Sequence, residues 1–249
     1  MKTPKIFAPV LLCLSLIMGC DKDENNETTG NYPLQIDNSW QYFTETQSGT
    51  YYSSFTSYWQ VVGNATINGI PVTKVSQRDS NTTSGEIHQA YTYYSNVSDG
   101  LYGIAAENHG SAFFFKNGEE NWPVLSNFSR SANEADSLFI PDTALYLLRY
   151  PIVLNEMWRS NEFGPSANTK RQWIGTETIT TPAGTFNCDK LQIMLDLDNN
   201  NLADPEESTI IQHFCDKGLI QEEQFRTLVS IAGDTSYFHR ITKLTQVNF

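Results

Sequence analysis

The sequence predicts a mainly β protein made of antiparallel meanders. Aromatic and β-branched residues alternate with polar residues from about residue 33 to the end, which is the side-chain period of strands. Turn signals recur at short intervals, and stretches of helical period are scarce. A third observation is an internal repeat. Together these features predict two meanders that form an open barrel, a clam-like body or a two-sheet body.

The first hairpin is predicted at Asn68-Gly69, which lies between two alternating runs in YWQVVGNATINGIPVTKVSQ. Asn-Gly readily adopts the positive φ angles that a two-residue hairpin turn needs. Further strand pairs are expected along the chain. They are residues 86–95 with 100–106, residues 176–180 with 186–197, and residues 226–232 with 237–247.

The segment TPAGTF, residues 181–186, is interpreted as a structural turn between two strands. Pro182 presets φ for a turn, and Gly184 is free to adopt a positive φ. Phe186 follows at a position from which its ring can pack onto the core. We therefore assign no chemistry to this motif.

The internal repeat relates the first half of the chain to the second. Order and spacing are nearly kept between the two copies. The correspondences are Trp40 with Trp158, Trp59 with Trp173, Gly63 with Gly175, Lys74 with Lys190, and Gly100 with Gly218. We expect a single β domain over residues 33–249, with repeats at about 33–145 and 146–249.

The N-terminus predicts a lipoprotein signal peptide over residues 1–19. Lys2 and Lys5 precede an apolar stretch, residues 6–18, that is too short to cross a ~30 Å hydrocarbon core as a helix. The sequence IMGC, residues 17–20, resembles the lipobox of bacterial lipoproteins. That resemblance implies cleavage before Cys20 and acylation of this cysteine, which anchors the chain to a membrane.

Residues 20–32 are expected to form a disordered tether, because they are polar and acidic and bury too little apolar surface to order themselves. The run DKDE at 21–24 looks like the acid-rich tag that directs some lipoproteins to the outer face of the outer membrane. We expect an outer-membrane, lipid-anchored protein on the cell-surface face rather than the periplasmic face. A plain solvated linker has the same composition.

The formal net charge is −12 at pH 7. Binding to phosphate backbones depends on Lys and Arg that neutralise them. A nucleic-acid partner is therefore excluded.

Two cysteines remain after processing, Cys188 and Cys215. In an antiparallel hairpin the residue numbers of opposed pairs have a constant sum. One register sets Cys188 opposite Cys215 and also Asp196 opposite Glu207. Opposed residues satisfy the Cα separation of a disulfide, so we predict this disulfide in an oxidising compartment. The alternative is two free, buried thiols.

The loop DLDNNNLADPEES, residues 196–208, is compared with the twelve-residue calcium template. Positions 1, 3, 5, 7, 9 and 12 of that template are filled by Asp196, Asp198, Asn200, the Leu202 carbonyl, Asp204 and Glu207. Asn201 departs from the template, because it stands where glycine makes the sharp turn, and Ala203 stands where an apolar β residue is usual. Structural calcium is one interpretation, and a solvated acidic turn is the other.

No catalytic motif is present in the sequence. It contains no G-x-S-x-G, no H-E-x-x-H, no phosphate loop and no dinucleotide fingerprint. The histidines His88, His109, His213 and His239 are scattered without metal-ligand spacing. We therefore expect no enzyme and no cofactor other than the possible calcium. A carboxylate pair formed only in three dimensions is the exception that sequence leaves open.

The segment SAFFFKNGEENWPV is the candidate ligand-binding region. In a strand, Phe113 and Phe115 lie on one face while Phe114 lies on the other. Either a second sheet covers the outer face or an apolar groove binds a ligand there. Trp122 is placed to line such a groove.

The chain resembles exported lipoproteins of the TapB-like type. The resemblance rests on YPLQIDNSWQY, PIVLNEMW, TPAGTFNCDKL and KGLIQEE, and it spans most of the mature chain. It implies a β-rich, open-barrel or clam-like domain without an established activity, and it supplies no catalytic residues.

Three functions follow from these observations. The first is a lipid-anchored, non-catalytic envelope protein that binds an apolar or amphipathic, lipid-like ligand or acts as an accessory envelope component. The second is a surface glycan-binding module, which requires aromatic rings exposed in a flat row. The third is a hydrolase, which requires two carboxylates with perturbed pKa values across a cleft.

Overall fold

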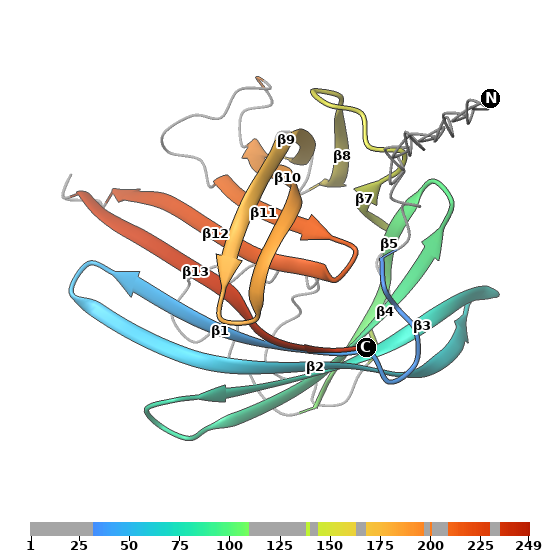
Figure 1. Ribbon diagram of the computed structural model, residues 1–249, viewed down its shortest axis with the longest axis horizontal. Helices are drawn as coiled ribbons and strands as arrows, with labels where there is room; N and C mark the ends of the chain where they lie inside the picture. Colours follow the sequence, from blue (N-terminus) through green and yellow to red (C-terminus); the bar gives the residue numbers. More distant parts are fainter. Residues whose placement is uncertain are drawn as a thin grey trace, which may run out of the picture.

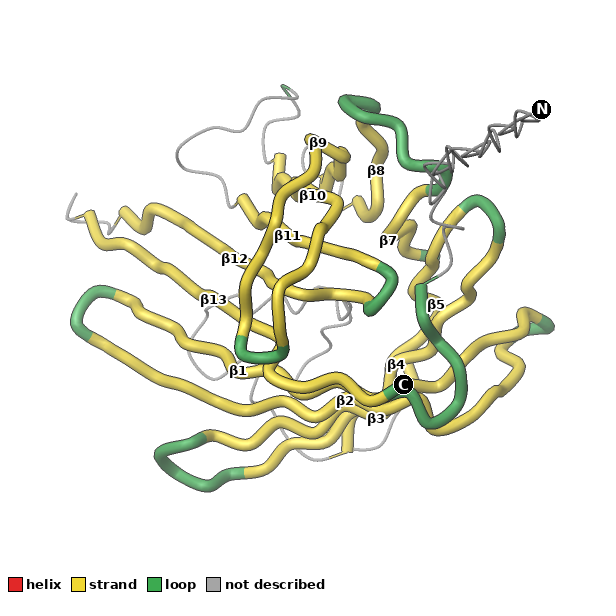
Figure 2. Tube along the Cα trace, viewed as in Figure 1, coloured by secondary structure: helices red, strands yellow, loops and turns green. Residues whose placement is uncertain are grey.

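The computed structural model describes residues 32–109, 138–139, 144–162, 168–196, 200, 209–229 and 235–249. All regular elements in these ranges are strands, joined mostly by short loops (Figure 2). The first seven strands are β1 (Ser39–Ser48), β2 (Tyr51–Ile67), β3 (Ile70–Asn81), β4 (Ile87–Val97), β5 (Gly100–His109), β6 (Leu138–Phe139) and β7 (Leu145–Arg149). The others are β8 (Met157–Glu162), β9 (Asn168–Thr181), β10 (Gly184–Asp196), β11 (Thr209–Cys215), β12 (Gly218–Val229) and β13 (Thr235–Asn248).

The strands form one antiparallel sheet that curls into a nearly closed barrel (Figure 1). Its order is β6-β5-β4-β3-β2-β1-β13-β12-β11-β10-β9-β8, and β7 pairs with β5. The meanders β1–β5 and β8–β13 are thus joined where the last strand pairs with the first. β7 and β8 lie next to each other without a ladder, which leaves one seam. The mainly β prediction is confirmed, and of the three bodies left open the structure has the open barrel.

Local turn chemistry explains two of the hairpins. Asn68 (φ 50°) and Gly69 (φ 81°) form the two-residue turn between Ile67 and Ile70, so the Asn-Gly prediction is confirmed. At the second hairpin the Ala183 N–H donates to the Thr181 hydroxyl over 3.2 Å.

The rest of the TPAGTF segment also matches its interpretation as a structural turn. Gly184 pairs with Thr181 at the start of β10 and has a φ of 142°. Phe186 is half-buried against the core. The segment therefore closes a hairpin, as the sequence predicted.

The two meanders bend at matching points of the sequence repeat. The ladder between β2 and β3 has a bulge at Val61/Gly63, and the ladder between β9 and β10 has one between Trp173 and Gly175. Gly63 lies opposite Lys74, and Gly175 lies opposite Lys190. A bulge increases the local bend and twist of a strand, which helps a sheet curl. The duplication itself stays a prediction.

The core fills one end of the barrel with aromatic side chains. Trp40, Trp59, Trp158 and Trp173 are all at most 7% exposed. Their rings contact one another or other buried rings, with centroids 6.3 Å apart for Trp158 and Trp173 and 5.1 Å apart for Trp59 and Tyr42. The β11–β12 turn covers this end, because the Trp40 indole donates to the Lys217 carbonyl over 2.7 Å.

No helix in the described part of the chain is long and apolar enough to span a membrane.

The bulge glycines give the first prediction. Gly63 (φ 158°) and Gly175 (φ 147°) adopt angles that other residues rarely take, while a Cβ there meets no atom within 4 Å. Gly63→Ala and Gly175→Ala should each lower the free energy of unfolding by about 1–3 kcal/mol through backbone strain alone. Thr66→Ala, at an exposed position of β2, should change it by less than about 0.5 kcal/mol. Urea unfolding measures all three, and equal stability of the glycine variants and wild type would contradict the argument.

Candidate functional site: the polar end of the barrel interior

The interior of the barrel changes from aromatic to polar along its length. On β1 the inward residues Trp40 and Tyr42 are followed by Thr44 and Thr46, and all four are buried. They share a face because strand side chains alternate. On β9 the same change runs from Trp173 to Arg171. We call the second half of the interior the polar end.

A charged cluster from the second meander lies at the polar end. The Arg240 guanidinium donates from Nη2 to Glu222 Oε1 over 2.7 Å, and Gln212 Nε2 donates to Glu222 Oε2 over 3.0 Å. Each of these three residues is at most 5% exposed. Burial raises the pKa of Glu222, and the Arg240 charge and the Gln212 hydrogen bond oppose that rise. A carboxylate buried to this degree requires such partners.

Arg171 is the second guanidinium of the polar end and is 1% exposed. Its Nη1 donates to the Leu147 carbonyl over 3.2 Å. Burial lowers the pKa of Arg171 to about 9, and the Glu222 carboxylate opposes that fall. The group is therefore charged at neutral pH. Arg171 and Arg240 together outnumber Glu222, which gives this cluster a positive excess.

A smaller cluster from the first meander surrounds Asp79. The Gln77 amide donates to Asp79 Oδ2 over 2.9 Å, and the Ser57 hydroxyl also hydrogen-bonds this carboxylate. Burial raises the pKa of Asp79, while these two donors and His88 lower it. The register places Asp79 between Ser57 on β2 and His88 on β4.

The seam beside the polar end is bridged by side chains. β7 does not form a ladder with β8. Its backbone carbonyls instead accept hydrogen bonds from side chains of β8 and β9. The donor–acceptor pairs are Trp158 Nε1 to Tyr146 at 3.1 Å, Arg171 Nη1 to Leu147 at 3.2 Å, and Trp173 Nε1 to Arg149 at 3.1 Å. A parallel bridge between Leu154 and Trp173 extends the contact. Among the described residues the β7 carbonyls are thus held by two indoles and one guanidinium, and the ion pair between Arg149 and Glu156 at 2.6 Å joins the end of β7 to the residue before β8.

Several buried polar atoms of the interior have no hydrogen-bond partner within the described ranges. Those at the polar end include Arg171 Nε, Gln212 Oε1, Asp79 Oδ1, Ser160 Oγ and Thr169 Oγ1, and Trp59 Nε1 is another at the aromatic end. Leaving such an atom unpaired typically costs about 1–3 kcal/mol. Buried polar groups that persist at this cost commonly mark a site for water or a ligand.

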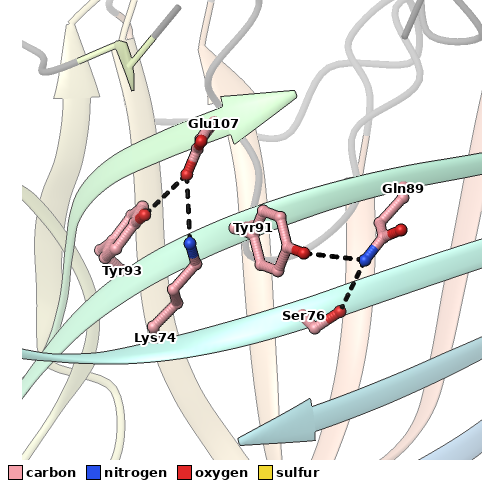
Figure 3. Close-up of polar contacts among 6 residues, drawn as sticks. All are labelled: Lys74, Ser76, Gln89, Tyr91, Tyr93 and Glu107. Atoms are coloured by element: carbon pink, nitrogen blue, oxygen red, sulfur yellow. Dashed lines mark hydrogen bonds and ion pairs between the residues drawn. The ribbon is translucent and has the colours of Figure 1, made fainter. Parts of the chain in front are cut away.

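A second charged cluster lies on the outer face of β3, β4 and β5 (Figure 3). Lys74 Nζ lies 3.3 Å from Glu107 Oε2 and 3.8 Å from the centroid of the Tyr91 ring. Tyr93 donates its hydroxyl to Glu107 over 2.7 Å. Every charge in this cluster is thus matched by a neighbour. We interpret it as cross-strand packing and not as a site.

The second meander has a similar outer cluster at Lys190, the counterpart of Lys74 in the repeat. Lys190 Nζ lies 2.8 Å from Glu177 Oε2, and His213 Nε2 lies 3.2 Å from the same oxygen. Hydrogen bonds from Lys190 and His213 lower the pKa of Glu177, and burial lowers the pKa of His213. Its charges are likewise paired.

The register predicted for the strands that carry the two cysteines is confirmed from Asp189 to Met194, whereas the predicted pairing of Asp196 with Glu207 lies outside the described residues. Asp189 pairs with Phe214, which places Cys188 next to Cys215. Both are free thiols here, so the disulfide is absent from the structure and stays a prediction. Hydrogen bonds from the Cys188 thiol and from the Lys217 N–H lower the pKa of Cys215.

The other predicted site residues fall mostly outside the described ranges. These are Cys20, the aromatic set Phe113, Phe115 and Trp122, and the loop residues Asp198, Leu202, Asp204 and Glu207. Asp196 ends β10, and Asn200 lies in an exposed bend. Among the described residues no group of three or more His, Cys, Asp or Glu side chains is suited to a metal ion. The calcium hypothesis therefore stays a prediction.

Sequence reasoning missed Arg171, Gln212, Glu222 and Arg240. Glu222 and Gln224 alternate along one strand, which would place both on one face. The apolar residues around them do not show which face is inward. The four described tryptophans do point inward, and they do not form the exposed row that glycan binding requires.

Comparison with known proteins gives no family. No protein-family model matches the chain, and no curated protein matches it. A solved structure described as an exported protein with a YmcC-like fold, from Bacteroides fragilis, is 11% identical, with a TM-score of 0.41 over 89% of this chain and 100% of that one. A second, described as a lipoprotein from Parabacteroides distasonis, is 14% identical, with a TM-score of 0.35 over 88% and 99%. TM-scores below 0.5 do not establish a relationship, so the TapB-like resemblance stays a prediction.

The buried ion pair gives the second prediction. Arg240→Met should lower the free energy of unfolding by about 3–5 kcal/mol, because the Glu222 carboxylate loses its closest cation while it stays buried. The double variant Arg240→Met/Glu222→Gln should be more stable than Arg240→Met alone. Arg78→Met, at an exposed position, serves as the control. Urea unfolding of the four proteins tests this, and a double variant no more stable than the single one would exclude the explanation.

Asp79 gives a pH-dependent prediction. A carboxyl group whose pKa is raised by folding stabilises the folded protein at low pH. This stabilisation is lost as the pH rises from the ordinary pKa of 3.8 through the pKa of the folded state. Asp79→Asn does not titrate, so the stability of the variant relative to wild type should rise between pH 4 and pH 7. The control is Asp216→Asn, an exposed carboxylate. Denaturant unfolding at both pH values is the measurement, and a difference that stays constant would show that Asp79 is not responsible.

Proposed function

We propose that this chain is a lipid-anchored, non-catalytic envelope protein whose barrel interior binds an amphipathic ligand. The observation that carries the proposal is the polar end, where buried charged side chains and polar atoms without partners lie beside apolar side chains. Ile193, for example, is the register partner of both Arg171 and Ile210. A ligand with an apolar body and a polar head matches this combination.

The size of the barrel supports a ligand. An interior of about eight strands is just wide enough for side chains to fill, and barrel diameter grows with strand number. The sheet path from β6 to β8 contains twelve strands. Barrels with more strands than eight have interiors wide enough to admit a molecule besides the side chains.

The division of the interior favours an amphipathic ligand over a wholly apolar one. The aromatic end is occupied by its own rings, which contact one another. The remaining interior is the mixed polar end. A ligand without a polar group would leave the unpaired atoms there without partners, at a cost in binding free energy.

The membrane anchor rests on the sequence. Cys20 follows the lipobox-like IMGC, and the polar tether after it gives the domain reach from the membrane surface. The outer membrane and its cell-surface face are the proposed location.

A hydrolase is the less favoured alternative. Asp79 and Glu222 both have raised pKa values, as that alternative requires. Glu222 is held by Arg240 and Gln212, however, and Asp79 contacts Ser57 directly. A catalytic triad needs an imidazole between the serine and the carboxylate.

The test is a titration of the full chain carrying Cys20→Ser, which removes the proposed acyl anchor. Dodecyl phosphate and dodecyl maltoside, each below its micelle concentration, should bind saturably at one site per chain. At 100 times Kd, binding should raise the free energy of unfolding by about 2.7 kcal/mol. Isothermal titration calorimetry and thermal unfolding measure both effects.

Failure of both amphiphiles to bind saturably would contradict the proposal. Binding of maltohexaose without binding of either amphiphile would favour the glycan alternative instead.

A further inference from the structure

We propose that Arg171, Ser160 and Thr169 form an anion-binding subsite beside the seam, which takes the carboxylate or phosphate group of the ligand. This inference rests on the proposed function and names the head group that the polar end recognises.

The three side chains come from adjoining strands. Thr169 and Arg171 are two residues apart on β9 and therefore share the interior face. Ser160 lies at the bulge of β8, between Arg159 and Asn161, and the backbone of Asn161 pairs with Thr169. Exposed fractions are 5% for Ser160, 3% for Thr169 and 1% for Arg171.

All three present a polar atom that the described part of the chain does not satisfy. These atoms are Arg171 Nε, Ser160 Oγ and Thr169 Oγ1. A guanidinium N–H can only donate, and a hydroxyl can donate or accept. The set therefore offers three donors to one acceptor-rich group, which is the requirement of a carboxylate or phosphate.

The electrostatic balance also selects an anion. The bond that Arg171 makes is to a neutral carbonyl, that of Leu147. The carboxylate that raises its pKa is that of Glu222, which is already hydrogen-bonded by Arg240 and Gln212. The charge of Arg171 is thus only partly compensated. An anion at Nε would complete the compensation in a region screened from water.

The subsite borders the seam, because Arg171 donates to the Leu147 carbonyl of β7. β7 and β8 share no backbone ladder, and among the described residues they are held together by three side-chain hydrogen bonds and by the Arg149–Glu156 ion pair rather than by a row of backbone bonds. Arg171 belongs to both the seam and the subsite. Its register partner Ile193 lies beside it on the neighbouring strand and supplies an apolar neighbour to the subsite.

The experiment uses the full chain with Cys20→Ser and isothermal titration calorimetry with inorganic phosphate, dodecyl phosphate and dodecyl maltoside. Arg171→Met should weaken dodecyl phosphate binding by about 10- to 100-fold, the range of a hydrogen bond to a charged group, and should leave dodecyl maltoside binding unchanged. Arg171→Lys should recover part of the loss. Lys190→Gln removes an outer-face cation and is the matched control.

Arg171→Met also removes the hydrogen bond to the Leu147 carbonyl, which helps to hold the seam. A second variant therefore tests the subsite without changing the seam. Ser160→Ala/Thr169→Val leaves all three seam donors in place and should weaken dodecyl phosphate binding by about 5- to 10-fold. Circular dichroism confirms that each variant is folded.

The outcomes separate this inference from the proposed function. Equal dodecyl phosphate affinity in wild type, Arg171→Met and the hydroxyl variant would overturn the anion subsite and leave amphiphile binding intact. Binding of inorganic phosphate alone, lost in Arg171→Met, would support the subsite with a free anion as its source and contradict the amphipathic ligand. Absence of binding by both phosphate probes would overturn the inference.

Discussion

The rest of the barrel depends on how its seam is held. No strand ladder joins β7 to β8, so side chains provide the closure through the carbonyls of β7. The donors are Trp158, Arg171 and Trp173. Each is buried in the interior, which means that the same residues that close the barrel also build its two ends. The indoles belong to the aromatic end, and the guanidinium belongs to the polar end.

This arrangement explains why charge is tolerated inside the protein. A buried guanidinium is costly unless its donors are used, and Arg171 uses one on the seam. Glu222 and Arg240 satisfy each other at the same end of the barrel. Other buried polar atoms at this end, such as Arg171 Nε, lack a hydrogen-bond partner within the described residues. This connects the fold to the proposed function, because a ligand can supply the missing partners. At the aromatic end the Trp158 and Trp173 indoles donate to carbonyls of β7, whereas Trp59 Nε1 has no partner in the described part of the chain. This end acts as the packed base of the barrel.

Local and periodic features were predictable from the sequence, and long-range ones were not. The Asn68-Gly69 turn, the turn after Thr181 and the register beside Cys188 follow from turn chemistry and strand period. The polar end was missed because its strands are polar on both faces. Arg171, for example, is flanked by Lys170 and Gln172, so the sequence does not show which of them points inward. The position of the seam depends on pairing between distant strands, which short-range patterns do not encode.

We expect the seam to be the weakest part of the barrel wall. Hydrogen exchange of the intact chain, followed by mass spectrometry, measures this directly, because local opening exposes amides in proportion to its free energy. Peptides from residues 145–162 should exchange faster than peptides from β1 and β13, whose backbone is paired on both sides. Arg171→Lys should increase exchange at the seam more than elsewhere. Protection of residues 145–162 equal to that of β1 and β13 would contradict a barrel closed by side chains.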